Sequence, residues 1–201
     1  MNVTGRMRRL VTFTRAGAAT VCAVMLAASA ACAPRGTAVG DTQGREPSPV
    51  EHVGTVRDDA LIGLVGSVQA TADSAVLDAL ADASIETVYR SVKDGGEAGA
   101  AARGQQGVRD MVSRVVSLVV ISDLDVSTDV QGWDDALRDA REAGIPVALL
   151  DPVHAPDDET LYAATLVLND RDAEATPIDD AAMTVLNDLP HDREITVTTV
   201  R

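Results

Sequence analysis

Polar side chains follow three apolar segments of the chain, at the points where each segment would end as a strand. Hydroxyl, amide and carboxylate groups at such positions could hydrogen-bond the hydroxyl groups of a sugar or another polyol. Each carboxylate could instead cap a helix or lie in a solvated turn, and the histidine could be an exposed loop residue. The candidate ligand-binding residues are Ser67 and Gln69 after the first segment, Asp123 and Asp125 after the second, and Asp151 with His154 after the third.

Sugar sites often place an aromatic ring against the face of the sugar, but the sequence offers few rings. After the first 31 residues, the aromatic residues are Tyr89, Trp133 and Tyr162. Trp133 falls on the apolar face of a predicted helix. We therefore expect its ring in the core and no aromatic ring in the site.

The same acidic residues could imitate the Mg²⁺-binding carboxylates of a phosphoacceptor site, but the rest of that chemistry is missing. Such a site needs a lysine late in the sheet, whereas the only lysine, Lys93, follows the second predicted strand. No serine lies in a G-x-S-x-G elbow, and the three histidines have no metal-ligand spacing. We therefore expect a protein that is not an enzyme and has no metal site or cofactor.

The elements that must position the candidate residues alternate between apolar strands and amphipathic helices. Between the strands, apolar residues recur at the i, i+3, i+4, i+7 spacing of a helix. This alternation predicts right-handed βαβ units, and hence an α/β fold with a doubly wound parallel sheet. The carboxyl ends of its strands meet at one edge, where such sheets bind ligands. The strands are predicted at 60–66, 85–92, 117–122, 145–151, 162–168 and 194–200.

Three stretches carry a resemblance to a known family. They read IGLVGS, GQQGVRDMVSRVVSLVVISD and ALRDAREAGIPVALLD, and the most specific part is the pattern A-x-x-A-G-I-P-V at 140–147, which leads to Asp151. Together they resemble the periplasmic sugar-binding proteins, the type I substrate-binding components of ABC transporters, which share their fold with sugar-responsive repressors. The resemblance covers about residues 58–200.

The resemblance implies a two-lobed molecule that closes around a solute, with lobe one at 58–155 and a partial second lobe at 156–201. It places a ligand-contacting aspartate at Asp170, preceded by Asn169. It also implies the solute-binding component of an importer, with a sugar as ligand and an ABC permease as partner. The alternative is a non-transporting interaction protein of the cell envelope that keeps this fold as a scaffold.

Residues 1–31 predict a signal peptide and export. Four arginines and no acidic residue accompany an apolar run at 16–28, which is too short for a transmembrane helix. Small residues then lead to Cys32, which resembles the lipidated cysteine of a bacterial lipoprotein, although Ser29 stands where those signals usually have leucine. Residues 32–57 are typical of a flexible tether. We expect an extracytoplasmic protein that a lipid anchors to the cell membrane; ordinary cleavage after Ala30, which would release a soluble protein, is the alternative.

The charge of the chain bears on its partners. It carries 17 basic and 31 acidic residues, a formal net charge of −14. A domain this acidic is repelled by phosphate backbones, so nucleic acid is not an expected partner. The β-branched segment at 194–200 predicts a C-terminal edge strand, through which two copies could pair as a homodimer.

Overall fold

The computed structural model describes residues 36–43, 54–69, 72–93 and 99–200. The predicted signal peptide at 1–31, Cys32 and much of the predicted tether lie outside these described residues. Within them, no helix is both long enough and apolar enough to span a membrane.

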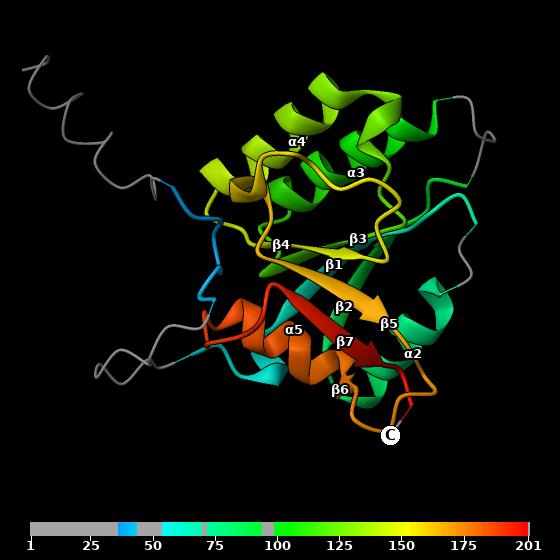
Figure 1. Cartoon of the computed structure of the whole chain (residues 1–201), viewed down its shortest axis with the longest axis vertical. Helices are drawn as coiled ribbons and strands as arrows, with labels where there is room; N and C mark the ends of the chain where they lie inside the picture. The colour runs from blue at the N-terminus through cyan, green and yellow to red at the C-terminus, as the bar shows by residue number, and fades with distance from the viewer. Residues whose placement is uncertain (1–35, 44–53, 70–71, 94–98, 201) are drawn as a thin grey trace, which may run out of the picture. The chain divides into compact units, whose positions relative to one another are not determined.

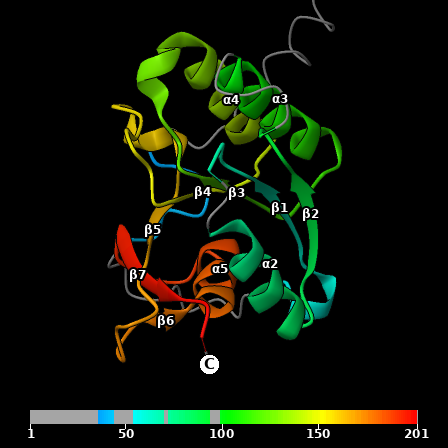
Figure 2. The same ribbon diagram turned by 90° about the vertical axis from the view of Figure 1, so that its right-hand side faces the viewer.

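Seven parallel strands form one sheet in the order β2-β1-β3-β4-β5-β7-β6 (Figures 1 and 2). Six of them match the six predicted strand positions closely, and the two-residue β6 adds to the far edge. The strands are β1 (Leu61–Val65), β2 (Glu86–Arg90), β3 (Leu118–Ser122), β4 (Val147–Leu150), β5 (Ala164–Leu168), β6 (Thr176–Pro177) and β7 (Glu194–Thr198).

Two pairs of helices cover the two faces of the sheet (Figure 2). On one face α3 (Ala100–Ser113) packs with α4 (Val130–Glu142), and on the other α2 (Asp73–Asp82) contacts α5 (Ile178–Leu186). Helices on both faces of a parallel sheet confirm the predicted α/β, doubly wound fold. The connections also contain three short 3₁₀ helices, η2 (Arg57–Asp59), η3 (Val126–Thr128) and η4 (Glu159–Leu161).

The central strand β3 shows why these sequences form this sheet. All five of its residues are buried, and alternate side chains enter two separate cores. Leu118 and Val120 pack with α2 and α5, whereas Val119 and Ile121 pack with α3 and α4. Burial on both faces explains why the strand is uniformly apolar instead of alternating. Burial of each side chain of this size stabilises the folded state by about 1.5–3 kcal/mol.

The C-terminal region extends the same sheet. The sequence prediction assigned 156–201 to a partial second lobe, separate from lobe one at 58–155. In the structure β5 pairs with β4, and β7 pairs with β5, so these strands continue the sheet of the predicted first lobe. The physical reason is that apolar side chains of β5 and α5 share one core with β1, β3 and α2.

Part of the predicted tether packs against the domain. Ala38 is buried, and Arg57 at the start of η2 forms ion pairs with Asp179 and Asp180 of α5. A composition rich in small and polar residues predicts flexibility only while the segment lacks partners on the domain. Among the described parts of 32–57, both 36–43 and 54–57 contain residues with such partners.

Candidate functional site

The strand order reverses between β1 and β3, and a cavity lies at this reversal. From β1 the chain first moves outward to β2 and then crosses back to β3, on the other side of β1. The connections that follow β1 and β3 therefore diverge to opposite faces of the sheet and leave a crevice at the carboxyl ends of these strands.

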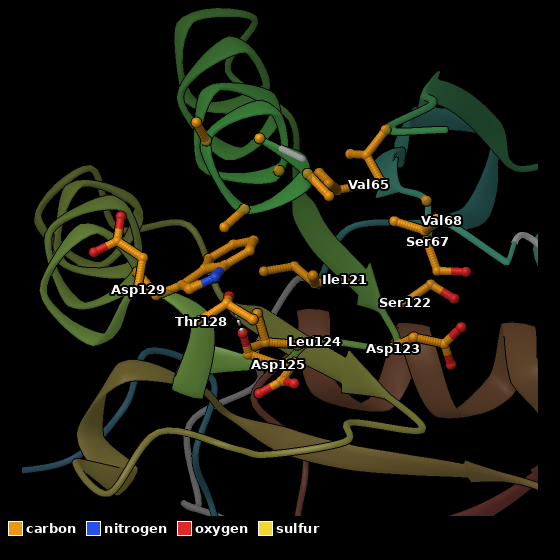
Figure 3. Close-up of a pocket in the computed structure, with 18 residues that line it drawn as sticks. Val65, Ser67, Val68, Ile121, Ser122, Asp123, Leu124, Asp125, Thr128 and Asp129 are labelled. Atoms are coloured by element: carbon orange, nitrogen blue, oxygen red, sulfur yellow. Dashed lines mark hydrogen bonds between the residues drawn. The ribbon is translucent and has the colours of Figure 1, made fainter. Parts of the chain in front are cut away.

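A cavity of about 630 Å³ occupies this crevice (Figure 3). Its walls come from the ends of β1 and β3, the first turn of α3 and the start of α4. The small residues at 99–102 and at Gly104 leave its α3 side open. The apolar part of the lining includes Val65, Val68, Val92, Ile121, Leu124 and Trp133, and the polar part includes Ser67, Ser122, Asp123, Asp125, Thr128 and Asp129.

Trp133 contributes an aromatic ring to the cavity wall. Only 5% of its surface is exposed, so the predicted core position is correct, but the residue also lines the cavity. Gly104 of α3 makes room for the ring, because a Cβ there would stand 2.6 Å from the outer edge of the indole. Within the described residues, the buried indole nitrogen has no hydrogen-bond partner. The expectation that no ring lines the site was therefore wrong.

Ser67 and Ser122 both line the cavity, and both are buried. The backbone N–H of Ser67 donates to the carboxylate of Asp73, 3.2 Å away, and the Tyr89 hydroxyl donates to the same oxygen at 2.8 Å. Asp73, at the start of α2, thereby holds Ser67 in place just after β1. In Figure 3 the oxygen atoms of Ser67, Ser122 and Asp123 lie on the same side of the close-up.

Asp123 and Asp151 directly follow the neighbouring strands β3 and β4. Both adopt a left-handed backbone conformation, with φ of 50° and 45°. Asp123 lines the cavity, whereas Asp151 turns to β5 and accepts a hydrogen bond from the Leu168 N–H at 3.0 Å. Burial raises the pKa of Asp151, and the negative charge of Asp123 raises it further. Their carboxylates are thus close enough to interact.

Asp125 and Asp129 line the cavity while capping helices. One Asp125 oxygen accepts from the Ser127 hydroxyl at 2.6 Å and the Ser127 N–H at 3.0 Å, and it lies 3.0 Å from Nδ1 of the exposed His154. Asp129 caps α4 through the Gly132 N–H and accepts from the Gln105 amide at 2.9 Å. The Ser127 hydrogen bonds lower the pKa of Asp125, and the Gln105 hydrogen bond lowers that of Asp129.

The structure brings together only some of the predicted site residues. Ser67, Asp123 and Asp125 line the cavity, and Gln69 is exposed beside it. Asp151, Asn169 and Asp170 are not part of its lining. Asn169 accepts from the Arg171 N–H.

Asp170 holds the end of β7, because its carboxylate accepts from both Thr198 and Thr199. The hydrogen bond from the Thr199 N–H contributes most to the lowered pKa of Asp170.

Sequence reasoning missed several lining residues, among them Ser122, Asp129 and Trp133. Asp129 could have been found as a helix cap, since it directly precedes the amphipathic segment of α4. Trp133 could not, because the same helical face supplies both the core and the cavity wall. Across the described ranges, no three His, Cys, Asp or Glu side chains are grouped in a way that could hold a metal ion.

Comparison with known proteins adds a description of the fold. No protein-family model and no curated protein matches the chain. The periplasmic binding protein component of the arabinose ABC transporter from Shewanella sp. ANA-3, solved with α- and β-L-arabinofuranose, is similar at 16% identity, with a TM-score of 0.43; the match covers 70% of this chain and 56% of that one. A galactofuranose binding protein matches at 16% identity and a TM-score of 0.43, over 68% of this chain and 56% of its own.

A third similar structure is an ABC transporter solute binding protein from Bacillus halodurans C-125 with bound myo-inositol. It is 14% identical, with a TM-score of 0.43, over 71% of this chain and 58% of its own length. The chain thus spans little more than half the length of these proteins, and the likeness at this identity concerns the fold alone.

Replacing Asp151 with asparagine should leave the free energy of unfolding at pH 7 unchanged or slightly higher. Asparagine keeps an oxygen that accepts from the Leu168 N–H, and it removes a charge that burial and Asp123 disfavour. Because the folded-state pKa is raised, the wild type loses stability as pH rises through that pKa. In urea denaturation, the difference in free energy of unfolding between Asp151→Asn and the wild type should therefore be smaller at pH 5 than at pH 7.

Asp151→Ala is the matched comparison, since it removes the acceptor as well as the charge. It should lower the free energy of unfolding by about 1 kcal/mol. A loss of more than about 2 kcal/mol in Asp151→Asn would contradict this account and mark the carboxylate itself as a buried structural group.

Replacing Asp170 with alanine should lower the free energy of unfolding by about 1 kcal/mol, because three hydrogen bonds to an exposed carboxylate are lost and water partly replaces them. Glu174→Ala removes one negative charge from the same exposed loop and should have almost no effect. The pKa of Asp170 is lowered in the folded state. Its contribution to the free energy of unfolding is therefore present at pH values above the ordinary pKa near 3.8, and it is lost as the pH falls through the folded-state pKa. Equal stability of the two variants at pH 7 would refute the assigned role.

Proposed function

We propose that the cavity at the ends of β1 and β3 binds a small polar solute, with neutral sugars and polyols as the ligand class. The observation that carries this proposal is a cavity of about 630 Å³ that is lined both by apolar side chains and by side chains with oxygen atoms. Its volume lies within the range of about 300–1,000 Å³ that is typical of small-molecule sites. The chain would then serve as the extracytoplasmic solute-binding component of an importer, with an ABC permease as its partner.

The chemistry of the lining supports this ligand class. Sugar hydroxyl groups can donate to the carboxylate of Asp123 and exchange hydrogen bonds with the hydroxyl groups of Ser67 and Ser122. The C–H face of a sugar ring can lie against Val65, Ile121 or the edge of the Trp133 ring. The described lining contains three carboxylates and no basic side chain, so an acidic sugar would meet electrostatic repulsion.

One observation favours the alternative of a non-transporting envelope protein. Trp133 is buried, with 5% of its surface exposed, and Asp125 and Asp129 already accept hydrogen bonds as helix caps. The ring therefore has little free surface for a ligand to contact, and the two carboxylates have fewer free lone pairs with which to accept hydrogen bonds from a ligand. A scaffold protein would keep the same caps and the same core ring without binding any solute.

A homodimer through the C-terminal edge also stays a proposal. β6 pairs with β7 only at Val197 and Thr198. Among the described residues, the stretch from Glu194 to Thr196 has β5 on one side and no paired strand on the other. Such an edge could accept a strand from a second copy.

Calorimetry with L-arabinose, D-galactose and myo-inositol tests the ligand class, and galacturonate serves as the charged counterpart of galactose. We expect binding of at least one neutral compound and at least tenfold weaker binding of galacturonate, because the lining is acidic. Asp123→Asn should weaken neutral binding by about tenfold, through the lost charge-assisted hydrogen bond.

Asp157→Asn is the control for that variant, because Asp157 is exposed and does not line the cavity. It should bind like the wild type. Absence of binding by all three neutral compounds would favour the scaffold alternative. Equal weakening by both substitutions would show that the solute binds elsewhere.

We further propose that Cys32 is lipidated and anchors the exported chain to the cell membrane. Cys32→Ala should release the protein from the membrane fraction, because an acidic domain has little affinity of its own for anionic lipid. Detergent phase partitioning of the expressed full-length chain measures this, with Cys22→Ala as a control inside the predicted signal peptide. Retention of the Cys32→Ala protein in the detergent phase would contradict the lipid anchor.

A further inference from the structure

Residues 36–43, which we call the clasp, lie against the domain and approach it closely. Ala38 has 4% of its surface exposed. Gly40 has a left-handed backbone conformation, with φ of 79°, and a Cβ there would stand 2.8 Å from the Val185 carbonyl oxygen of α5. It would also stand 3.0 Å from Cβ of Pro146. Only glycine fits both the conformation and the space at this point.

Polar contacts fasten the clasp to the segment before β7. Asp41 forms an ion pair with Arg193 at 3.2 Å, and their side chains are 14% and 20% exposed. The Gly40 carbonyl oxygen lies 2.9 Å from Nε2 of His191, and the Thr42 hydroxyl donates to the Leu189 carbonyl oxygen. Four residues of the clasp, including Ala38, are thus in contact with the domain or buried against it.

Arg193 is itself held rigidly, which makes it a firm attachment point. Its guanidinium lies 4.0 Å from the centre of the Tyr162 ring and donates to the carbonyl oxygens of Ala163 and Glu159. An ion pair to a side chain that packing already orders costs less conformational entropy than one between two free surface side chains.

The contacts of the clasp lie at the amino edge of the sheet. Pro146 directly precedes β4, Ala163 directly precedes β5, and Arg193 directly precedes β7. In a parallel sheet all strands start at one edge and end at the other, and the cavity lies at the ends of β1 and β3. In Figure 1 the blue clasp lies at the left, while the arrows of β5 and β7 point to the right. A five-residue strand separates the two edges by about 17 Å.

Docking of the clasp on the domain also shortens the length of free chain between Cys32 and the domain. A free tether over 32–57 would have a root-mean-square length of about 28 Å and would let the domain turn in any direction. With the clasp docked, the four residue steps from Cys32 to Gly36 span at most about 14 Å. The point from which an anchor could hold the domain is then fixed near its amino edge.

We propose that the clasp holds the amino edge of the sheet toward the membrane and leaves the cavity facing away from it, an orientation that rests on the proposed lipidation of Cys32. The cavity would then open away from the membrane, so delivery of solute to a permease in that membrane would require the clasp to undock. The surface near Arg193 and Tyr162 would face the lipid head groups.

Energy transfer to the bilayer tests this orientation in the full-length, lipidated chain. Fluorescent donors are placed at Glu142→Cys, at the end of α4 beside the amino edge, or at Gln69→Cys, just after β1 at the carboxyl edge. Both positions are exposed. The lipid head groups of the liposomes carry the acceptor. We expect about twofold higher transfer from the Glu142→Cys probe, because the probes differ in height by at least about one strand length.

Gly40→Val should release the clasp and make transfer from the two probes nearly equal, since its Cβ collides with Val185 and Pro146. Gly36→Val is the matched control: its φ of 88° is equally unsuited to valine, but nothing lies within 4 Å of the new Cβ. It should keep the wild-type difference. Asp41→Asn weakens the clasp without steric conflict and should give an intermediate difference, so a misfolded Gly40→Val protein would not end the test.

The outcomes separate this inference from the lipid anchor. If Cys32→Ala abolishes liposome association but the wild-type probes transfer equally, the anchor stands and the orientation is wrong. If Gly40→Val and Asp41→Asn both keep the wild-type difference, the clasp does not set the orientation. If Cys32→Ala leaves liposome association unchanged, both the proposed lipid anchor and the proposed orientation are wrong.

Discussion

The parallel pairing of β1 with β3 is the constraint on which the rest of the structure depends. Because both strands are buried on two faces, they need helices on both sides, and the chain must cross from one face to the other between them. That crossing separates the two following connections and opens the cavity. The same pairing aligns the strand ends, so that Ser67 and Asp123, far apart in the sequence, lie at one edge.

Carboxylates at this edge serve the protein in two distinct ways. Some accept hydrogen bonds from nearby N–H or O–H groups and so hold neighbouring backbone in place; these are Asp73, Asp129, Asp151 and Asp170. Asp123 has no such bond within the described structure and faces the cavity. An acidic strand end is therefore not by itself a ligand-binding group, since loops at the end of a parallel strand also need acceptors.

The opposite edge has a different task. There the start of three strands meets the clasp, and the ion pair of Asp41 with Arg193 joins segments about 150 residues apart in sequence. A domain with a cavity at one edge and an attachment point at the other has a defined direction. This polarity follows from parallel strands alone, since an antiparallel sheet would mix strand starts and strand ends at both edges.

The sequence by itself determined the elements of the fold, because their signals are local. Uniformly apolar strands such as β3 and the i, i+3, i+4, i+7 faces of the helices need no knowledge of distant residues to be recognised. The carboxyl-edge position of Ser67, Asp123 and Asp125 followed from the same periodicity together with the geometry of parallel sheets.

Only the tertiary structure decided what each residue at the edge contacts. It showed that Trp133 belongs both to the core and to the cavity wall, since Gly104 on another helix makes room for its ring. It turned Asp151 and Asp170 away from the cavity, and it joined β5 and β7 to the first sheet. It also docked residues 36–43, whose composition predicts a flexible chain. In each case the decisive partner lies far away in sequence, where periodicity and composition carry no information.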